Sequence, residues 1–120
     1  MQTPTDNRGV LDYERLDVYR CAIEFLRIAF SLVEQLPRGH GFLADQLRRA
    51  GTSIPLNIAE AAGKTSSKER AHFHAIARGS AMECGAILDV IRLLGVAPAE
   101  VAQGKQLLVR TVSMLSKMCR

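Results

Sequence analysis

The sequence has no tryptophan, and aromatic side chains make up only 5% of its residues. Clusters of aromatic and β-branched residues, which the strands of β-sandwiches and barrels need, are also scarce. Hydrophobic residues account for 48% of the 120 residues, which is enough for a packed core and excludes a disordered chain. A chain of this length suits one domain. The composition therefore favours an all-α fold.

Targeting and disulfide signals are missing as well. No stretch reaches the ~18 consecutive apolar residues of a membrane span, and the polar segment Met1–Gly9 lacks the pattern of a signal peptide. Cys21, Cys84 and Cys119 are odd in number and form no C-x-x-C motif, which is typical of a reducing compartment. We expect a cytoplasmic protein with no membrane partner, whose cysteines are small core or surface thiols.

Motifs for catalysis, metals and nucleotides are weak or absent. Residues 39–41 (Gly-His-Gly) lack the strand, spacing and lysine of a phosphate-binding loop. Residues 69–72 (Glu-Arg-Ala-His) match the Glu-x-x-His motif of di-iron bundles, but such a site needs two copies and two further glutamates. His72 and His74 would point to opposite sides of a helix, so we expect solvated or interface histidines. We predict no enzyme activity, metal site or cofactor.

The positive charge, +4 overall, is concentrated in the middle of the chain. Residues 37–80 contain seven basic and three acidic side chains, whereas the remainder contains nine of each. Such an excess could form a basic surface that binds phosphates, although ordinary solvated helix faces would give the same count.

Apolar residues at alternating steps of three and four predict a helix that runs to about Leu36 and ends before Pro37 and Gly39. We expect its core seam to consist of Leu16, Tyr19, Ile23, Leu26, Phe30 and Val33. A second apolar set on the same helix suggests a subunit interface, and it consists of Phe25, Ile28, Leu32 and Leu36.

A second helix is predicted over 43–62, ending at Gly63, with a bend near Pro55 because proline removes one backbone hydrogen bond. Its expected buried row consists of Leu43, Leu47, Ala50, Ile54, Ile58 and Ala61. A third helix over 66–94 begins with a capping box formed by Ser66 and Glu69. Its expected seam is Phe73, Ile76, Ser80, Cys84, Ile87, Ile91 and Leu94, and residues 79–81 are small enough for close helix approach.

Pro98 opens a fourth helix. Its expected seam consists of Val101, Gly104, Leu108, Thr111, Leu115 and Met118. Short connections between four such helices predict an antiparallel up-down-up-down four-helix bundle. We assign residues 1–11 to a flexible N-terminal segment and residues 12–120 to the bundle domain. Seams in heptad register need partner helices, so a membrane-surface role is disfavoured.

Three segments carry a family resemblance. Residues 46–64 (QLRRAGTSIPLNIAEAAGK) resemble the signature Q-[LM]-R-R-A-x-x-S-I-[PA]-x-N-I-A-E-G of the four-helix bundle proteins encoded in intervening sequences of bacterial 23S rRNA genes. Residues 16–19 with Ala22, and residues 73–83 (FHAIARGSAME), are also similar to that family, over roughly 12–118. Ala61 and Cys84 depart from its usual Gly and Leu. The resemblance implies a ring-shaped homopentamer, and a relative is the accessory variability protein of diversity-generating retroelements, which associates with reverse transcriptase and nucleic acid.

Five basic residues are candidates for phosphate contact: Arg48, Arg49, Lys64, Lys68 and Arg78. Arg49 and Arg78 could instead form ion pairs with Glu60 and Glu83. No row of aromatic residues accompanies the basic ones, so backbone or shape recognition is favoured over base stacking.

A set of polar residues could suggest an active site, and it consists of Gln46, Ser53, Asn57, Glu60, Ser80 and Glu83. It contains no activated nucleophile, histidine base or triad, so we interpret it as a network that fixes helix register or oligomer geometry. The sequence thus predicts a non-enzymatic homo-oligomer that binds RNA, DNA or a nucleic-acid-processing protein. The alternative is a protein-binding or structural homo-oligomer with no affinity for nucleic acid.

Overall fold

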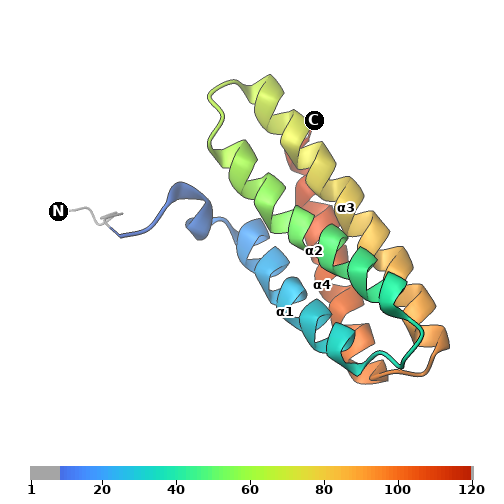
Figure 1. Ribbon diagram of the computed structural model, residues 1–120. Coiled ribbons are helices and arrows are strands. Elements are labelled where there is room, and N and C mark those ends of the chain that lie inside the picture. Colours follow the sequence, from blue (N-terminus) through green and yellow to red (C-terminus); the bar gives the residue numbers. More distant parts are fainter. Residues whose placement is uncertain (1–8, 120) are drawn as a thin grey trace.

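The computed structural model describes residues 9–119. Within that range the chain forms four α-helices and no strand, in a bundle preceded by one short 3-10 turn (Figure 1). The elements are η1 (Asp12–Arg15), α1 (Asp17–Gln35), α2 (Gly41–Ala62), α3 (Ser67–Leu93) and α4 (Pro98–Met118). The all-α prediction is confirmed. Most of the predicted flexible segment, residues 1–8, lies outside the described residues.

The predicted start and stop residues act locally as expected. Gly39 and Gly95 adopt φ angles of +92° and +74°, a conformation that favours glycine. The Ser66 hydroxyl accepts a hydrogen bond from the Glu69 backbone N–H at 3.0 Å and caps α3. Pro98 occupies the first turn of α4, where its missing N–H costs nothing. α2 continues through Pro55, and the bend near that residue stays a prediction.

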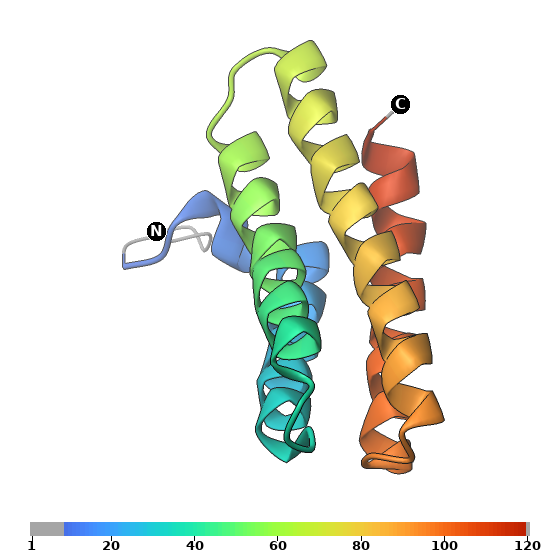
Figure 2. The same cartoon turned by 45° about the vertical axis from the view of Figure 1, so that its right-hand side comes forward.

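Each helix packs against two others: α1 and α3 both contact α2 and α4. Figure 2 shows α1 and α2 on one side of the bundle, and α3 and α4 on the other. The predicted buried row of α2 is confirmed at every position. No helix in residues 9–119 is both long and apolar enough to cross a membrane.

The structure changes the roles expected for the two apolar faces of α1. The proposed interface residues Phe25, Ile28 and Leu32 are in the core, with exposed fractions of 0%, 3% and 0%. The expected seam is confirmed in part: Val33 is buried, and Leu16, Tyr19 and Leu26 pack partly buried against the core. Ile23 and Phe30 of that seam remain 41% and 45% exposed. Both stripes have helical spacing, so periodicity alone did not distinguish them. The stripe that lies in the core is the one whose Phe25 ring packs against Gly51 of α2 and Gly104 of α4.

Gly51 and Gly104 make room for the Phe25 ring. A Cβ at Gly104 would lie 3.1 Å from Leu88 Cδ1 and 3.5 Å from Phe25 Cε1, and a Cβ at Gly51 would lie 3.1 Å from Leu26 Cδ1. The close helix contacts of the core therefore occur at these two positions. Gly79 is not one of them, because a Cβ there meets nothing within 4 Å.

Substitution of Gly104 tests this contact. We expect Gly104→Leu to lower the free energy of unfolding by about 1–3 kcal/mol, because the added side chain must displace Leu88 or Phe25. Ala102→Leu, an exposed change on the same helix, is the matched control and should stay within about 0.5 kcal/mol of the wild type. Urea unfolding measures both. Equal stability of the two variants would contradict the packing.

The predicted seam of α3 is confirmed at Cys84, Ile87 and Ile91, which are buried, but the buried face of the first half is displaced by one residue. There Ile76 is 39% exposed, whereas Ala77 and Ala81 are buried. The small residues Ala77 and Ala81 let the neighbouring helices approach, and this displaces the larger Ile76 from the core. His74 is also buried, at 6% exposed, with Nδ1 3.2 Å from the Met118 carbonyl oxygen. The expectation of a solvated or interface histidine was therefore wrong for His74, while His72 is exposed.

Candidate nucleic-acid interface

The candidate phosphate contacts separate into two groups in the structure. Lys64, Lys68 and Arg78 lie at the end of the bundle where α2 leads into α3. Arg48 and Arg49 lie within the N-terminal half of α2, in different surroundings.

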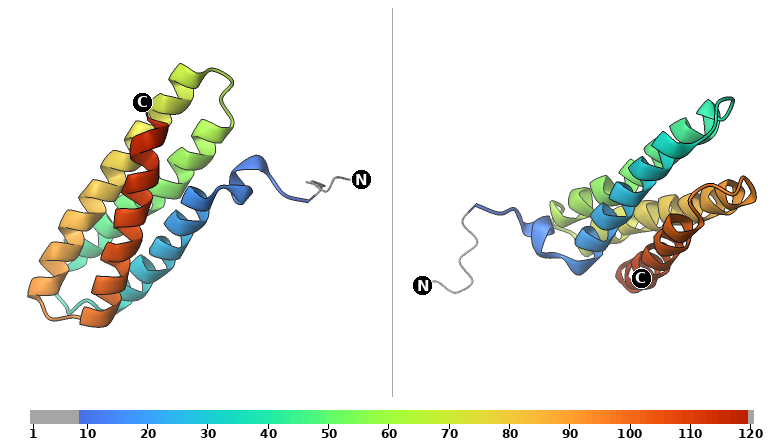
Figure 3. Two further views of the ribbon diagram at one scale, coloured as in Figure 1. Left: turned by 180° about the vertical axis from the view of Figure 1, so that it is seen from behind. Right: turned by 90° about the horizontal axis from the view of Figure 1, so that it is seen from below.

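The first group lies where α3 meets the end of α4. Arg78 Nε donates to Ser116 Oγ at 2.8 Å, which joins the middle of α3 to the last turns of α4. The view from behind in Figure 3 shows the C-terminal end of α4 beside the first half of α3. Lys117 follows Ser116 directly and lies at the same end of the bundle, on the side of α4 that borders Leu16 and Asp17 at the start of α1. This residue is 49 positions from Lys68 in the sequence.

The connection before α3 is also held by a basic side chain. Arg70 Nη1 donates to the carbonyl oxygens of Lys64 and Thr65, at 3.2 and 3.0 Å. Lys64 Nζ lies 3.0 Å from Glu60 Oε2 and 5.3 Å from the centre of the Phe73 ring. These contacts fix the path of the chain between α2 and α3. We call the resulting surface the basic end, and it consists of Lys64, Lys68, Arg70, Arg78 and Lys117.

Acidic residues are scarce at the basic end. The stretches 67–80 of α3 and 110–119 near the end of α4 contain five basic residues, one of them Arg110, and a single acidic residue, Glu69. Lys64 lies outside these stretches and pairs with Glu60. The other halves of these helices, 81–93 and 98–109, contain two basic and three acidic residues. Clustered cations with few carboxylates attract polyanions, because phosphate contacts release counterions.

Arg48 and Arg49 have carboxylate partners. Arg48 Nη1 lies 3.4 Å from Asp45 Oδ1 on the same helix, and Arg49 pairs with Glu83 of α3. Exposed pairs of this kind are weak, but each brings a negative charge beside the arginine. Glu83 thus pairs with Arg49, while Arg78 bonds to Ser116. Within one chain, residues 9–119 therefore do not form the pairs of Arg49 with Glu60 and of Arg78 with Glu83 that the sequence suggested.

Part of the predicted polar network joins α2 to α3. Ser80 Oγ donates to Ser53 Oγ at 2.8 Å, and Asn57 Nδ2 donates to the same hydroxyl at 2.9 Å. The Arg49–Glu83 pair connects the same two helices. Gln46 is exposed, and Glu60 pairs with Lys64 on its own helix. The bonded residues therefore set the register of α2 and α3 within one chain.

The described residues offer little for covalent or metal chemistry. No three His, Cys, Asp or Glu side chains in residues 9–119 are placed to hold a metal ion. Burial, with a smaller effect from Glu83, raises the pKa of Cys84 to about 12, so its thiol stays protonated at neutral pH.

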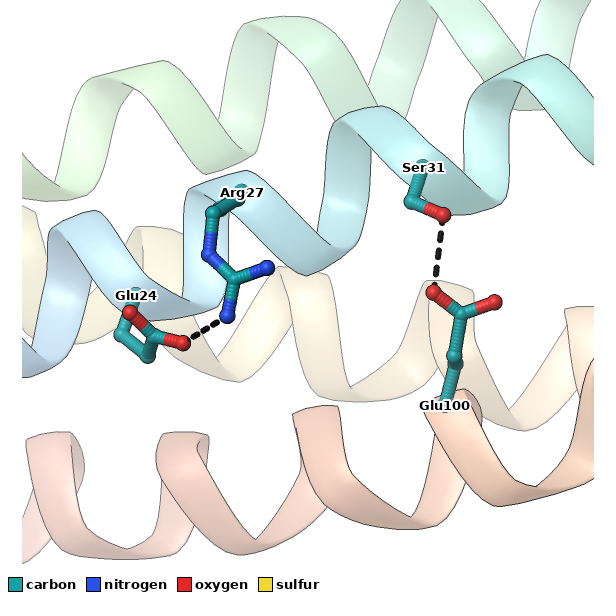
Figure 4. Close-up of polar contacts among 4 residues, drawn as sticks. All are labelled: Glu24, Arg27, Ser31 and Glu100. Carbon is teal, nitrogen blue, oxygen red and sulfur yellow. Dashed lines mark hydrogen bonds and ion pairs between the residues drawn. The ribbon is translucent and has the colours of Figure 1, made fainter.

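Acid stability is sensitive to a contact between α1 and α4. Glu100 accepts a hydrogen bond from Gln35 Nε2 at 2.7 Å. It also accepts one from Ser31 Oγ at 2.7 Å (Figure 4). These bonds, that of Gln35 first, hold the pKa of Glu100 below its ordinary value of 4.5. These bonds therefore stabilise the folded chain fully at pH values above the pKa of Glu100 in the unfolded chain. The stabilisation is lost as the pH falls through the lower pKa that Glu100 has in the folded chain.

We expect Glu100→Gln to reduce the loss of stability on acidification below pH ~4.5. Urea midpoints across the acidic range measure the effect. Glu34→Gln removes an exposed carboxylate of α1 and should keep the pH dependence of the wild type. Parallel curves for wild type and Glu100→Gln would contradict this assignment.

The sequence did not indicate two members of the basic end. Lys117 lay outside the stretch with excess positive charge, and only the folding of α4 against the other helices brings it to the same end of the bundle as Lys68. Arg70 lay within that stretch, but nothing in the sequence showed that its guanidinium holds the connection before α3.

A comparison with protein families matches residues 14–117 to the family described as 23S rRNA-intervening sequence protein. The comparison with curated proteins found no match. The family match covers all four helices except the last residue of α4, and it includes both groups of candidate residues. The chain therefore belongs to the 23S rRNA-intervening sequence protein family.

Proposed function

We propose that this protein is a non-enzymatic homo-oligomer that binds RNA through the basic end. The observation that supports the proposal is the excess of basic side chains at this end of the bundle, where the five residues of the basic end outnumber the nearby carboxylates Glu60 and Glu69. The name of the family, which refers to 23S rRNA-intervening sequences, supports a role related to RNA.

The basic end suits recognition of the phosphate backbone. Its phenylalanine ring, Phe73, is half-buried beneath Lys64 and is not exposed as a platform for stacked bases. The exposed ring of His72 packs edge-on against Phe73. A ring of copies, a homopentamer as the family resemblance implies, would repeat the basic end on every subunit. Weak contacts at each subunit would then add up to tight binding of a long polyanion.

Fluorescence anisotropy of a labelled, structured ribosomal RNA fragment tests this function. We expect the affinity to fall steeply as the salt concentration rises, with a similar response for unrelated RNA sequences. Duplex DNA in the same titration distinguishes a shape-selective RNA binder from a general polyanion binder. No binding at low salt would contradict the proposal.

The second candidate is a structural or protein-binding homo-oligomer without affinity for nucleic acid. It is supported by exposed apolar side chains on all four helices, among them Leu56, Met82 and Val109, which are 63%, 55% and 67% exposed. Oligomer formation without a response to RNA or DNA would favour this candidate.

A further inference from the structure

Two opposite faces of the bundle carry unpartnered apolar surface. On the first face, α1 presents Ile23 and Phe30, which are two helical turns apart. Leu26 fills the space between α1 and α2, against Gly51. We call this surface the ridge, and it consists of Ile23, Leu26 and Phe30.

The second face is a groove between α3 and α4 of about 520 Å³. Its lining is mainly small and apolar: Met82, Gly85, Ala86, Leu108, Val109 and Val112. A Cβ at Gly85 would meet nothing within 4 Å, so the floor of the groove is open. An uncharged, exposed stripe of α3 continues along it, formed by Ala75, Gly79, Met82, Ala86, Val90 and Leu93.

These faces cannot overlap, because of the way the helices are arranged. In residues 9–119, α1 does not contact α3 and α2 does not contact α4. The bundle is thus a square in which the α1–α2 face lies opposite the α3–α4 face (Figure 2). One chain can therefore use both faces at the same time.

We infer that the ridge of one copy seats in the groove of the next copy. This rests on the homo-oligomer of the proposed function and names the surfaces that form it. Large side chains project from the ridge, and the groove offers glycine and alanine with open space above them. Such an interface joins two different surfaces, so repetition generates a closed ring or a filament rather than a two-fold dimer.

The size of the faces suits a stable contact. The stripe from Ala75 to Leu93 is about 27 Å long at the helical rise, and two helices are roughly 20 Å wide. The resulting face of roughly 540 Å² in projection approaches the ~800 Å² of accessible surface that each partner buries in a standard interface.

Two ion pairs within the chain lie beside the two faces, and Glu34 and Arg48 also border Phe30. Lys105 Nζ lies 2.5 Å from Asp89 Oδ1 in the groove wall, and Arg27 pairs with Glu24 near the ridge. When the two faces dock, each of these four charged residues therefore keeps its partner. The basic end is not part of either surface, so it would stay available to RNA in the assembly.

Two single-face variants test the inference. Phe30→Glu places a charge on the ridge, and Gly85→Glu places one in the groove without a clash inside the chain. We expect each variant alone to have the mass of a single 13.2 kDa chain by light scattering. An equimolar mixture should give twice that mass, because one intact ridge and one intact groove remain and the pair cannot extend further. Gln103→Glu, an exposed change on α4 outside both surfaces, should keep the wild-type mass.

Far-UV circular dichroism checks that every variant keeps its helical fold. An oligomer that survives Gly85→Glu, or two monomeric variants that do not pair when mixed, would overturn the ridge-in-groove contact alone. A wild-type chain that is monomeric would instead contradict the homo-oligomer of the proposed function, and the contact with it.

Discussion

Replacement of Phe25 by alanine is expected to lower the free energy of unfolding by about 3–5 kcal/mol. The ring is fully buried, and its atoms lie 3.5 Å and 3.8 Å from where a Cβ at Gly104 and at Gly51 would stand. Because three helices meet at this ring, its removal leaves a cavity that none of them can fill by a small shift. Urea unfolding followed by circular dichroism measures the loss.

Phe30→Ala is the matched control, since it removes the same side chain from the same helix at a position that is 45% exposed. Its effect on an isolated chain should be about 1 kcal/mol or less. Any further loss should depend on protein concentration, because Phe30 belongs to the ridge. If Phe25→Ala altered only the oligomer mass and left the stability of the monomer unchanged, the placement of Phe25 in the core would be wrong.

Neutralisation of three lysines of the basic end should weaken RNA binding on the order of 10²-fold at about 0.1 M salt. The variant replaces Lys64, Lys68 and Lys117 with glutamine and keeps Arg70 and Arg78, whose hydrogen bonds support the fold. Loss of three phosphate contacts per bound copy should also reduce the slope of log affinity against log salt by about 2. Anisotropy titrations over a series of salt concentrations measure both quantities.

A control with the same change in net charge replaces Arg27, Arg38 and Arg92 with glutamine. These residues belong to the middle of α1, the connection that follows it and the end of α3, away from the basic end. Its affinity should stay within about 3-fold of the wild type. Equal losses in the two triple variants would show that RNA responds to total charge and not to the basic end.

The sequence predicted the four helices and their ends because those signals are local. Gly39 and Gly95 supply the turns, Ser66 supplies a cap and Pro98 begins a helix, and each acts within a few residues. The buried row of α2 was equally accessible, since only one of its faces is continuously apolar.

The inner face of α1 was not accessible, because that helix has two apolar stripes of helical period. The choice depends on residues far away in the sequence, namely the glycines at 51 and 104 that make room for Phe25. Periodicity describes one helix and says nothing about which partner it meets.

Only part of the candidate site was predicted, because the rest also depends on residues that meet only in the folded chain. Composition indicated Lys64, Lys68 and Arg78, but the same signal included Arg48 and Arg49, whose carboxylate neighbours Asp45 and Glu83 are recognised only in the folded chain. Lys117 required the folding of α4 against the other helices.

The most direct test of an RNA-binding homo-oligomer is its solution mass by light scattering, measured alone and with a structured ribosomal RNA fragment at low and moderate salt. We predict a multiple of the chain mass for the protein alone, a larger mass with RNA at low salt, and release of the RNA at moderate salt. An oligomer whose mass is unchanged by RNA at low salt would contradict RNA binding and favour the structural or protein-binding candidate.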